Sequence, residues 1–263
     1  MWVLPASAWA LAFAFLALLT ILAFQRHLLF PSPKRNAVLQ AATHHVHTRW
    51  VAVPGTRLQA WLAEPMKAGE RPQGLLYFNG RREHPTSVFH CLHAMPGVHV
   101  LCFRYRGLGL HWRKPGEAQL LADALAVLDW MGTHWRLAPQ DITIAGRSLG
   151  SGIAVPLSAA RPVRQLALIS PFDEALSAIR VRLPFVRAWM LKDRFSSSTH
   201  LERVRCPVLL IVGERDRTVP PAVSHRLLAG WRGEWQAFSL PELGHRGLLR
   251  DARVQQRLGA FCR

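Results

Sequence analysis

The sequence predicts an α/β fold in which a mainly parallel sheet is covered by helices on both faces. Short apolar segments of strand length alternate with longer segments whose apolar residues recur at helical spacing. The candidate catalytic residues follow expected strand ends, where open α/β sheets place their sites. The chain has 263 residues, half of them hydrophobic, which suits one such unit with a large core.

The expected elements follow one another at regular spacing. A hairpin turns at Pro54-Gly55, and Pro115-Gly116 opens the longest helix. We expect strands at residues 48–53, 57–63, 74–78, 98–103, 141–145, 165–170, 207–212 and 235–240. We expect helices at residues 85–95, 117–133 and 149–160, with others between and after the last two strands. Such alternation implies parallel strands joined by crossover helices.

Residues 172–204 interrupt this alternation, and we interpret them as a small lid over the site. In many enzymes a lid closes over the bound substrate and shields the reaction from water. The segment mixes cations with large apolar residues, which suits a membrane interface. Its cations are Arg180, Arg182, Arg187, Lys192 and Arg194. A packing subdomain without lipid contact is the alternative.

The first 24 residues carry no charged side chain, and Ala6–Phe24 is a nearly pure apolar run of 19 residues. At about 1.5 Å per residue, such a helix spans roughly the 30 Å of bilayer hydrocarbon. A cleaved signal peptide is the alternative, but the run lacks the basic start that such peptides carry. We therefore expect a single-pass transmembrane anchor at residues 1–25, a stalk at 26–46 and a catalytic domain at 47–263. Flanking Arg26, Lys34 and Arg35 favour a cytoplasmic catalytic domain.

The chain is strongly basic, with 33 Lys and Arg against 16 Asp and Glu and a formal charge of +17. No segment resembles a nucleic-acid-binding module, so we expect no nucleic-acid partner. An anionic lipid bilayer is the favoured partner of this charge. The oligomeric state stays open.

A G-x-S-x-G sequence at Gly146–Gly150 places Ser148 between an expected strand and an expected helix. This context is what a nucleophile elbow needs, because the serine sits on a strained strand-to-helix turn. Gly146 and Gly150 remove Cβ atoms that would collide there. Ser148 is therefore the candidate nucleophile.

An acid and a histidine follow Ser148 in the order Ser, acid, His. Asp216 follows the strand at 207–212, and His245 follows the last strand. A serine hydroxyl needs a base within hydrogen-bond reach, and the acid orients that base. Other acids near these loops are Glu214, Asp173 and Glu242, but only Asp216 combines the expected loop with this chain order.

Acyl transfer also needs donors for the developing oxyanion. We expect one from the backbone N–H of Leu149, directly after the nucleophile, and one from Arg81 N–H in the supporting loop that contains Asn79 and Gly80. The side chains of Arg81 and Arg147 are expected in solvent.

The chain shows no metal-site spacing, and no cofactor is expected. His44, His45 and His47 lie in the stalk region without nearby carboxylates or thiolates. The four cysteines lack the C-x-x-C spacing of zinc and redox sites, and we expect buried free thiols.

Several segments together resemble the membrane-anchored α/β-hydrolase-domain serine hydrolases, a group often labelled serine-aminopeptidase-like. They are Tyr77–Gly80, Tyr105–Gly109, Asp123-Ala124, Gly146–Gly150, Ser170–Asp173, Lys192–Ser196 and the Asp216 and His245 loops. The resemblance runs from about Arg49 to the C-terminus. It implies the α/β-hydrolase fold, the triad Ser148, Asp216 and His245, and lipid-like or acylated small-molecule substrates.

Two departures from this group stand out. Many relatives carry His-Gly-Asn where this chain has Asn79-Gly80-Arg81, and Leu110-His111-Trp112 replaces the small or acidic residue that often follows Gly109. The leading hypothesis is a membrane-anchored serine hydrolase that cleaves an ester, thioester or amide through an acyl-serine. The alternatives are an inactive scaffold or lipid-binding protein of the same fold, and a peptidase acting on short peptides.

Overall fold

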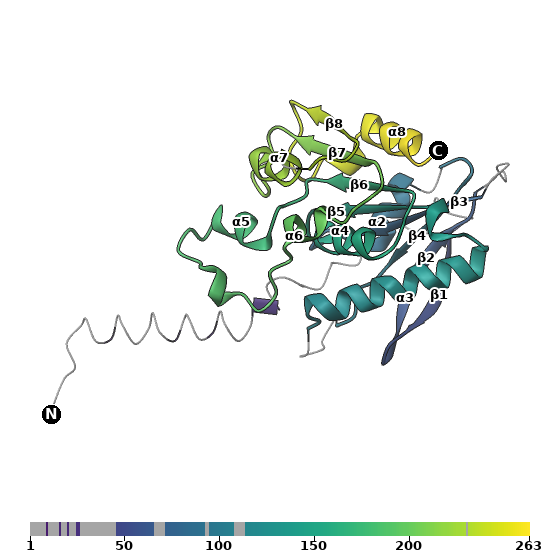
Figure 1. Ribbon diagram of the computed structural model, residues 1–263, viewed down its shortest axis with the longest axis horizontal. Helices are drawn as coiled ribbons and strands as arrows, with labels where there is room; N and C mark the ends of the chain where they lie inside the picture. Colours follow the sequence, from purple (N-terminus) through teal and green to yellow (C-terminus); the bar gives the residue numbers. More distant parts are fainter. Residues whose placement is uncertain are drawn as a thin grey trace.

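In the computed structural model, eight strands of the described residues form one sheet in the order β1-β2-β4-β3-β5-β6-β7-β8 (Figure 1). The first two strands are antiparallel to their neighbours, and strands β3 to β8 are parallel. The strands are β1 Val46–Val53, β2 Thr56–Ala63, β3 Gln73–Phe78, β4 Val98–Phe103, β5 Ile142–Arg147, β6 Gln165–Ile169, β7 Val208–Gly213 and β8 Trp235–Leu240.

The central strands are mostly apolar and are buried along nearly their whole length, because helices cover both faces of the sheet. Every residue of β5 and β7 is buried, whereas the edge strand β8 is mostly exposed. Continuous apolar runs are typical of parallel strands that are covered on both sides. This burial pattern explains why the strand boundaries could be read from the sequence to within one or two residues.

Two sets of helices cover the two faces of the sheet. Helix α2 (Pro85–Leu92) and helix α8 (Ala252–Phe261) pack on one face, with Phe89 and Leu258 fully buried. Helices α3 (Glu117–Trp135), α4 (Ser151–Ala160) and α7 (Pro221–Ala229) cover the other face. The three layers form the α/β-hydrolase architecture that the resemblance implied.

The structure describes residues 46–65, 72–92, 95–107, 114–229 and 231–263, and the single residues Trp9, Leu16, Thr20, Gln25 and Arg26. Most of the expected anchor and stalk, including His44 and His45, and the segment Leu110-His111-Trp112 lie outside these residues. Within the described residues, none of the helices combines the length and the apolar character that a membrane crossing requires.

Some element boundaries differ from the expectation. Strand β1 begins at Val46, inside the expected stalk, because its pairing with Ala63 extends the hairpin. The helix expected at residue 149 begins as a 3-10 turn, η3 (Ser148–Gly150), and becomes α-helical at Ser151. Residues 172–204 contain two short helices, α5 (Ala175–Arg180) and α6 (Ser197–Leu201), and the turn η4 (Ala188–Met190).

Candidate active site

Ser148 lies on a sharp turn between strand β5 and helix α4. Its φ of +50° is in the left-handed region, which is costly for a residue with a side chain. Neighbouring glycines allow this turn: a Cβ on Gly146 would lie 2.6 Å from the Cβ of Ala154, and one on Gly150 would overlap the carbonyl oxygen of Phe78. The hydroxyl of Ser151 donates to the Ser148 carbonyl at 2.6 Å. The turn therefore has the geometry expected of a nucleophile elbow.

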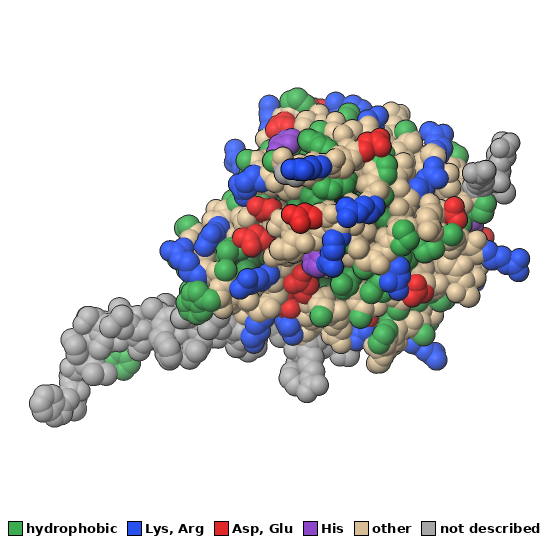
Figure 2. Space-filling view, in the orientation of Figure 1, with side chains coloured by type: hydrophobic (Ala, Val, Ile, Leu, Met, Phe, Trp, Pro, Cys, Tyr) green, Lys and Arg blue, Asp and Glu red, His purple; other side chains and the backbone are tan. Residues whose placement is uncertain are grey.

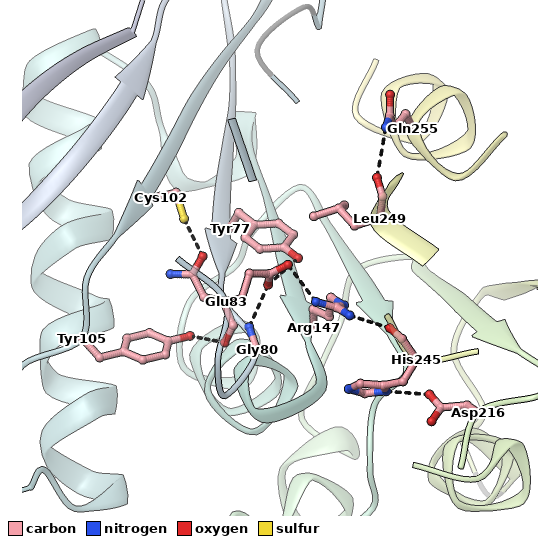
Figure 3. Close-up of polar contacts among 11 residues, drawn as sticks. Tyr77, Gly80, Glu83, Cys102, Tyr105, Arg147, Asp216, His245, Leu249 and Gln255 are labelled. Carbon is pink, nitrogen blue, oxygen red and sulfur yellow. Dashed lines mark hydrogen bonds and ion pairs between the residues drawn. The ribbon is translucent and has the colours of Figure 1, made fainter. Parts of the chain in front are cut away.

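Asp216 and His245 are in direct contact, as the close-up in Figure 3 shows. His245 Nδ1 lies 2.6 Å from Asp216 Oδ2. The other carboxylate oxygen of Asp216 accepts backbone hydrogen bonds from Thr218 at 2.7 Å and Val219 at 2.9 Å. The carboxylate is buried and fully engaged, so the imidazole is held with Nε2 as its remaining reactive nitrogen.

Opposing effects act on the pKa of Asp216. Burial alone would raise the pKa, because it disfavours the charged form. The hydrogen bond and charge of His245, together with the two backbone amides, outweigh burial and hold the pKa below its usual value. Asp216 therefore stays ionised at neutral pH, as a residue that stabilises an imidazolium must.

Backbone contacts fasten the loops that carry these two residues. Strands β7 and β8 are parallel neighbours, so the loops that follow them start side by side. Arg215 N–H donates to Leu243 O at 3.0 Å, and a Cβ on Gly213 would overlap that same carbonyl oxygen. The parallel strands and these backbone contacts thus hold Asp216 and His245 close together.

A buried arginine connects these loops to the elbow. Arg147, directly before Ser148, donates from Nη2 to the carbonyl oxygen of His245 and from Nη1 to Glu83 Oε1 at 2.8 Å (Figure 3). Among the described contacts, no hydrogen bond joins Ser148 to His245 directly. Such a bond commonly forms only when substrate is bound.

Arg147 was expected in solvent, and that expectation was wrong. The residue is 9% exposed, and the side chain of its partner Glu83 is 8% exposed. A guanidinium is buried only when its charge is paired and its donors are used. Burial by itself would lower the pKa of Arg147, but the negative charge of Glu83 chiefly reverses this and raises it. The side chain of Arg81 is exposed, as expected.

Side chains shape the loop after β3. Asn79 points into the sheet, where its amide donates to Phe103 O at 2.9 Å and its Oδ1 accepts from the Cys102 thiol at 2.8 Å. The amide of Gly80 donates to Glu83 Oε2 at 2.9 Å. Asn79 is therefore a structural residue, and Gly80 N–H is already used within the loop.

Glu83 is the site residue that the sequence reasoning missed. Its carboxylate accepts from Gly80 N–H, from Arg147 and, at 3.2 Å, from the Tyr77 hydroxyl. The available signal was Arg147 itself, because a cation inside a buried elbow requires an acidic partner. Glu83 lies three residues beyond Gly80, on the loop that faces the elbow.

The described residues hold no cluster of three or more His, Cys, Asp and Glu side chains suited to a metal ion. A cavity of about 280 Å³ lies at the opposite edge of the sheet, lined in part by Arg164, Glu234 and Arg257. Its lining includes neither a serine nor a histidine. Ser148, Asp216 and His245 lie at the other edge, where the parallel strands β5, β7 and β8 end.

Solved structures share this fold. The esterase Pf2001 of Pyrococcus furiosus superposes with a TM-score of 0.67 at 15% identity, covering 88% of this chain and 96% of that one. A serine hydrolase without lid from Xanthomonas campestris gives a TM-score of 0.59 at 17% identity, covering 83% and 92%. At these identities the likeness shows the α/β-hydrolase fold alone.

Sequence relatives give the family. The uncharacterized protein Rv2307c of Mycobacterium tuberculosis is 32% identical over 240 residues, which cover 88% of this chain and 84% of that protein. The lysophosphatidylserine lipase ABHD12 of Danio rerio is 31% identical over 177 residues, or 58% of this chain and 46% of the lipase. The chain belongs to the α/β-hydrolase family of serine hydrolases. No family model matches the chain.

The lipase relative and the shared family support a hydrolase. The chain spans less than half of the lipase from Danio rerio, so that enzyme's substrate does not transfer with the family. Fold and family do not choose the acyl group, because chemically different sites are built on the same scaffold.

Proposed function

We propose that the chain is a membrane-anchored serine hydrolase that cleaves an ester, thioester or amide bond through an acyl-serine intermediate on Ser148. The observation that carries this proposal is the 2.6 Å contact between His245 and the buried Asp216, on loops joined to the Ser148 elbow through Arg147. A nucleophile, a base and an orienting acid at one sheet edge are the parts that acyl transfer requires.

In the proposed reaction, Ser148 Oγ attacks the substrate's carbonyl carbon while His245 Nε2 takes its proton. Asp216 accepts from Nδ1–H and stabilises the imidazolium. The N–H groups of Leu149 and Arg81 stabilise the oxyanion, and one such donor contributes about 3–4 kcal/mol to catalysis. His245 then protonates the leaving group, and a water activated by the same base hydrolyses the acyl-serine.

Acylated, lipid-like substrates are the proposed class. The lipase name of the Danio rerio relative supports this class, as do the exposed apolar side chains within residues 181–189. The apolar run at residues 6–24 supports a single-pass anchor, and the flanking Arg26, Lys34 and Arg35 support a cytoplasmic catalytic domain. Protease protection of the full chain in sealed vesicles tests that orientation.

Covalent labelling tests the proposed chemistry. A fluorophosphonate probe reacts with an activated serine, so we expect the full chain in vesicles to be labelled and the Ser148→Ala variant to be unlabelled. Ser158→Ala is the matched control, because Ser158 is buried in helix α4 and its hydroxyl has no partner among the described residues. Failure of the folded wild type to label would support the inactive-scaffold alternative.

Substrate class is tested by a chain-length series of acyl esters and acyl thioesters, with short peptides as the comparison. We expect turnover to increase with acyl length and peptides to be poor substrates. Faster cleavage of peptides with a free amino terminus would favour the peptidase alternative.

A further inference from the structure

The segment between β6 and β7 carries the largest concentration of exposed apolar residues in the described part of the chain. Val181, Leu183, Phe185 and Trp189 are 43%, 38%, 57% and 67% exposed. These four residues lie within nine positions, whereas the other exposed large apolar residues are dispersed. Large apolar patches that stay in contact with water commonly mark interaction sites.

Cations surround this apolar group, and we call residues 180–194 the basic-apolar surface. Five exposed cations belong to it: Arg180, Arg182, Arg187, Lys192 and Arg194. Asp193 is the one acidic residue in the segment, and it is 5% exposed. In Figure 2, blue and green side chains gather at the end of the domain where Figure 1 places the chain after α5.

Arg26, in the N-terminal part of the chain, neutralises the charge of Asp193. Arg26 binds its carboxylate with two hydrogen bonds of 2.6 and 3.0 Å. The same carboxylate accepts from Glu117 N–H at 2.9 Å, at the start of helix α3. The ion pair therefore connects residue 26 both to the basic-apolar surface and to the body of the domain.

The side chain of Gln25 binds backbone atoms of the same segment. It is 4% exposed, and its side chain accepts from Lys192 N–H at 2.7 Å and donates to the carbonyl oxygen of Met190 at 3.2 Å. Met190 is the neighbour of Trp189. The residue that directly follows the apolar run of residues 6–24 thus contacts the residue next to Trp189 in sequence.

We propose that the basic-apolar surface lies on a bilayer that contains anionic phospholipid, with Leu183, Phe185 and Trp189 at the level of the headgroups and the cations against the lipid phosphates. Apolar and aromatic side chains partition to this interface, and each nearby Lys or Arg adds attraction to anionic lipid. Unlike the proposed anchor, this contact belongs to the catalytic domain and orients it. It rests on the proposed membrane location and not on the acyl-serine chemistry.

The charge pattern favours a bilayer over a protein partner. Five exposed cations without an exposed acid complement a uniformly anionic surface, whereas protein interfaces deplete charge at their cores.

Site-specific fluorescence tests the proposal on the full chain. In a Cys91→Ala background, the remaining native cysteines are buried, so a new cysteine can be labelled with the polarity-sensitive dye NBD. Phe185→Cys and Trp189→Cys report on the surface, and Trp50→Cys on strand β1, 63% exposed, is the matched control. The proteins are reconstituted in phosphatidylcholine vesicles with or without phosphatidylglycerol, and with nitroxide-labelled lipid as quencher.

In vesicles with phosphatidylglycerol, we expect blue-shifted emission and nitroxide quenching at positions 185 and 189, and neither change at position 50. Arg182→Gln with Arg187→Gln should lower the ratio of docked to undocked surface about fivefold per cation removed. High salt and pure phosphatidylcholine should act in the same direction.

Separate outcomes overturn separate claims. Unquenched labels at 185 and 189 on protein that floats with the vesicles would overturn the docking of the surface and leave the anchor intact. Failure of the full chain to float with anionic vesicles would contradict both the anchor and the surface. A blue shift that grows with protein concentration in detergent, without lipid, would show that a second copy covers the surface and would also overturn the proposal. Fluorophosphonate labelling of the same samples reports independently on the acyl-serine chemistry.

Discussion

The two loop regions that flank Ser148 are held in place by different means. On the acid–base side, backbone contacts such as Arg215 N–H to Leu243 O align the loops, and the side chains of Asp216 and His245 contact each other. On the oxyanion side, the side chains of Asn79 and Glu83 hold the loop instead. Oxyanion stabilisation needs backbone N–H groups. On that side, side chains therefore do most of the work of holding the loop.

Arg147 joins the two sides. Its guanidinium binds Glu83 on the oxyanion side and the His245 carbonyl on the acid–base side, and Ser148 follows it in sequence. A rigid planar donor with several N–H groups suits such a bridge better than a flexible ammonium. Through Arg147, Glu83 is connected to the backbone of His245, the proposed base, although it does not contact the imidazole itself.

The largest effect is expected from breaking the acid–base side. Asp216→Asn keeps the size of the side chain but removes the charge that stabilises the imidazolium, and comparable changes in serine hydrolases lower kcat by about 10⁴-fold. The measurement is hydrolysis of an activated ester together with the rate of fluorophosphonate labelling.

Asp173→Asn is the matched control, because Asp173 pairs with the exposed Arg226 and not with His245. We expect it to keep wild-type activity, since exposed ion pairs contribute little. Equal losses in both variants would mean that Asp216 has no special part in the reaction.

Breaking the bridge is expected to have the next largest effect. Glu83→Gln leaves the Arg147 charge buried without its counter-charge, which costs about 3–5 kcal/mol of unfolding free energy. Chemical denaturation measures this cost. Because the His245 carbonyl then loses a well-positioned donor, kcat should fall as well.

A double variant distinguishes positioning from mere stability. Glu83→Gln with Arg147→Met replaces the buried pair by a neutral and an apolar group, so part of the lost stability should return. If Arg147 positions His245, kcat should stay low although stability recovers. A kcat that recovers together with the unfolding free energy would show that the bridge acts on folding alone.

The parts of the fold that could be predicted are those set by local apolar patterns. Strand β8 was expected at residues 235–240 and lies there, and the hairpin turns at Pro54-Gly55 as expected. The approach of Asp216 to His245 was also predictable, because parallel neighbouring strands deliver their following loops to one edge. The catalytic roles of these residues remain a prediction.

What could not be predicted depends on contacts between side chains far apart in sequence. Glu83 binds Arg147 across 64 positions, and no local pattern pairs them. Asn79 was expected only as part of the supporting loop, and its amide turns inward because Phe103 O and the Cys102 thiol lie on the neighbouring strand. A buried polar group takes the partner that tertiary packing supplies.

A smaller effect is expected from loosening the oxyanion side alone. Asn79→Ala removes the buried hydrogen bonds to Phe103 and Cys102, and an unsatisfied buried acceptor costs about 1–3 kcal/mol. Thermal unfolding measures this cost. The Asp216–His245 contact lies on the other side, so the pH profile of kcat should keep its wild-type shape. A shifted profile would show that the two sides are coupled more tightly than the contacts indicate.

The smallest expected effect is the contribution of Asp216 to the pH dependence of stability. Its folded pKa is below the ordinary value of about 3.9, so between the two values the unfolded chain binds more protons and stability rises with pH. The contribution is therefore complete above the unfolded pKa and is lost as the pH falls through the folded one. Each unit of pKa depression corresponds to about 1.4 kcal/mol. Denaturant unfolding of wild type and Asp216→Asn over the acid range should give curves that converge as the pH falls; parallel curves would mean that the His245 contact does not hold this carboxylate in its charged form.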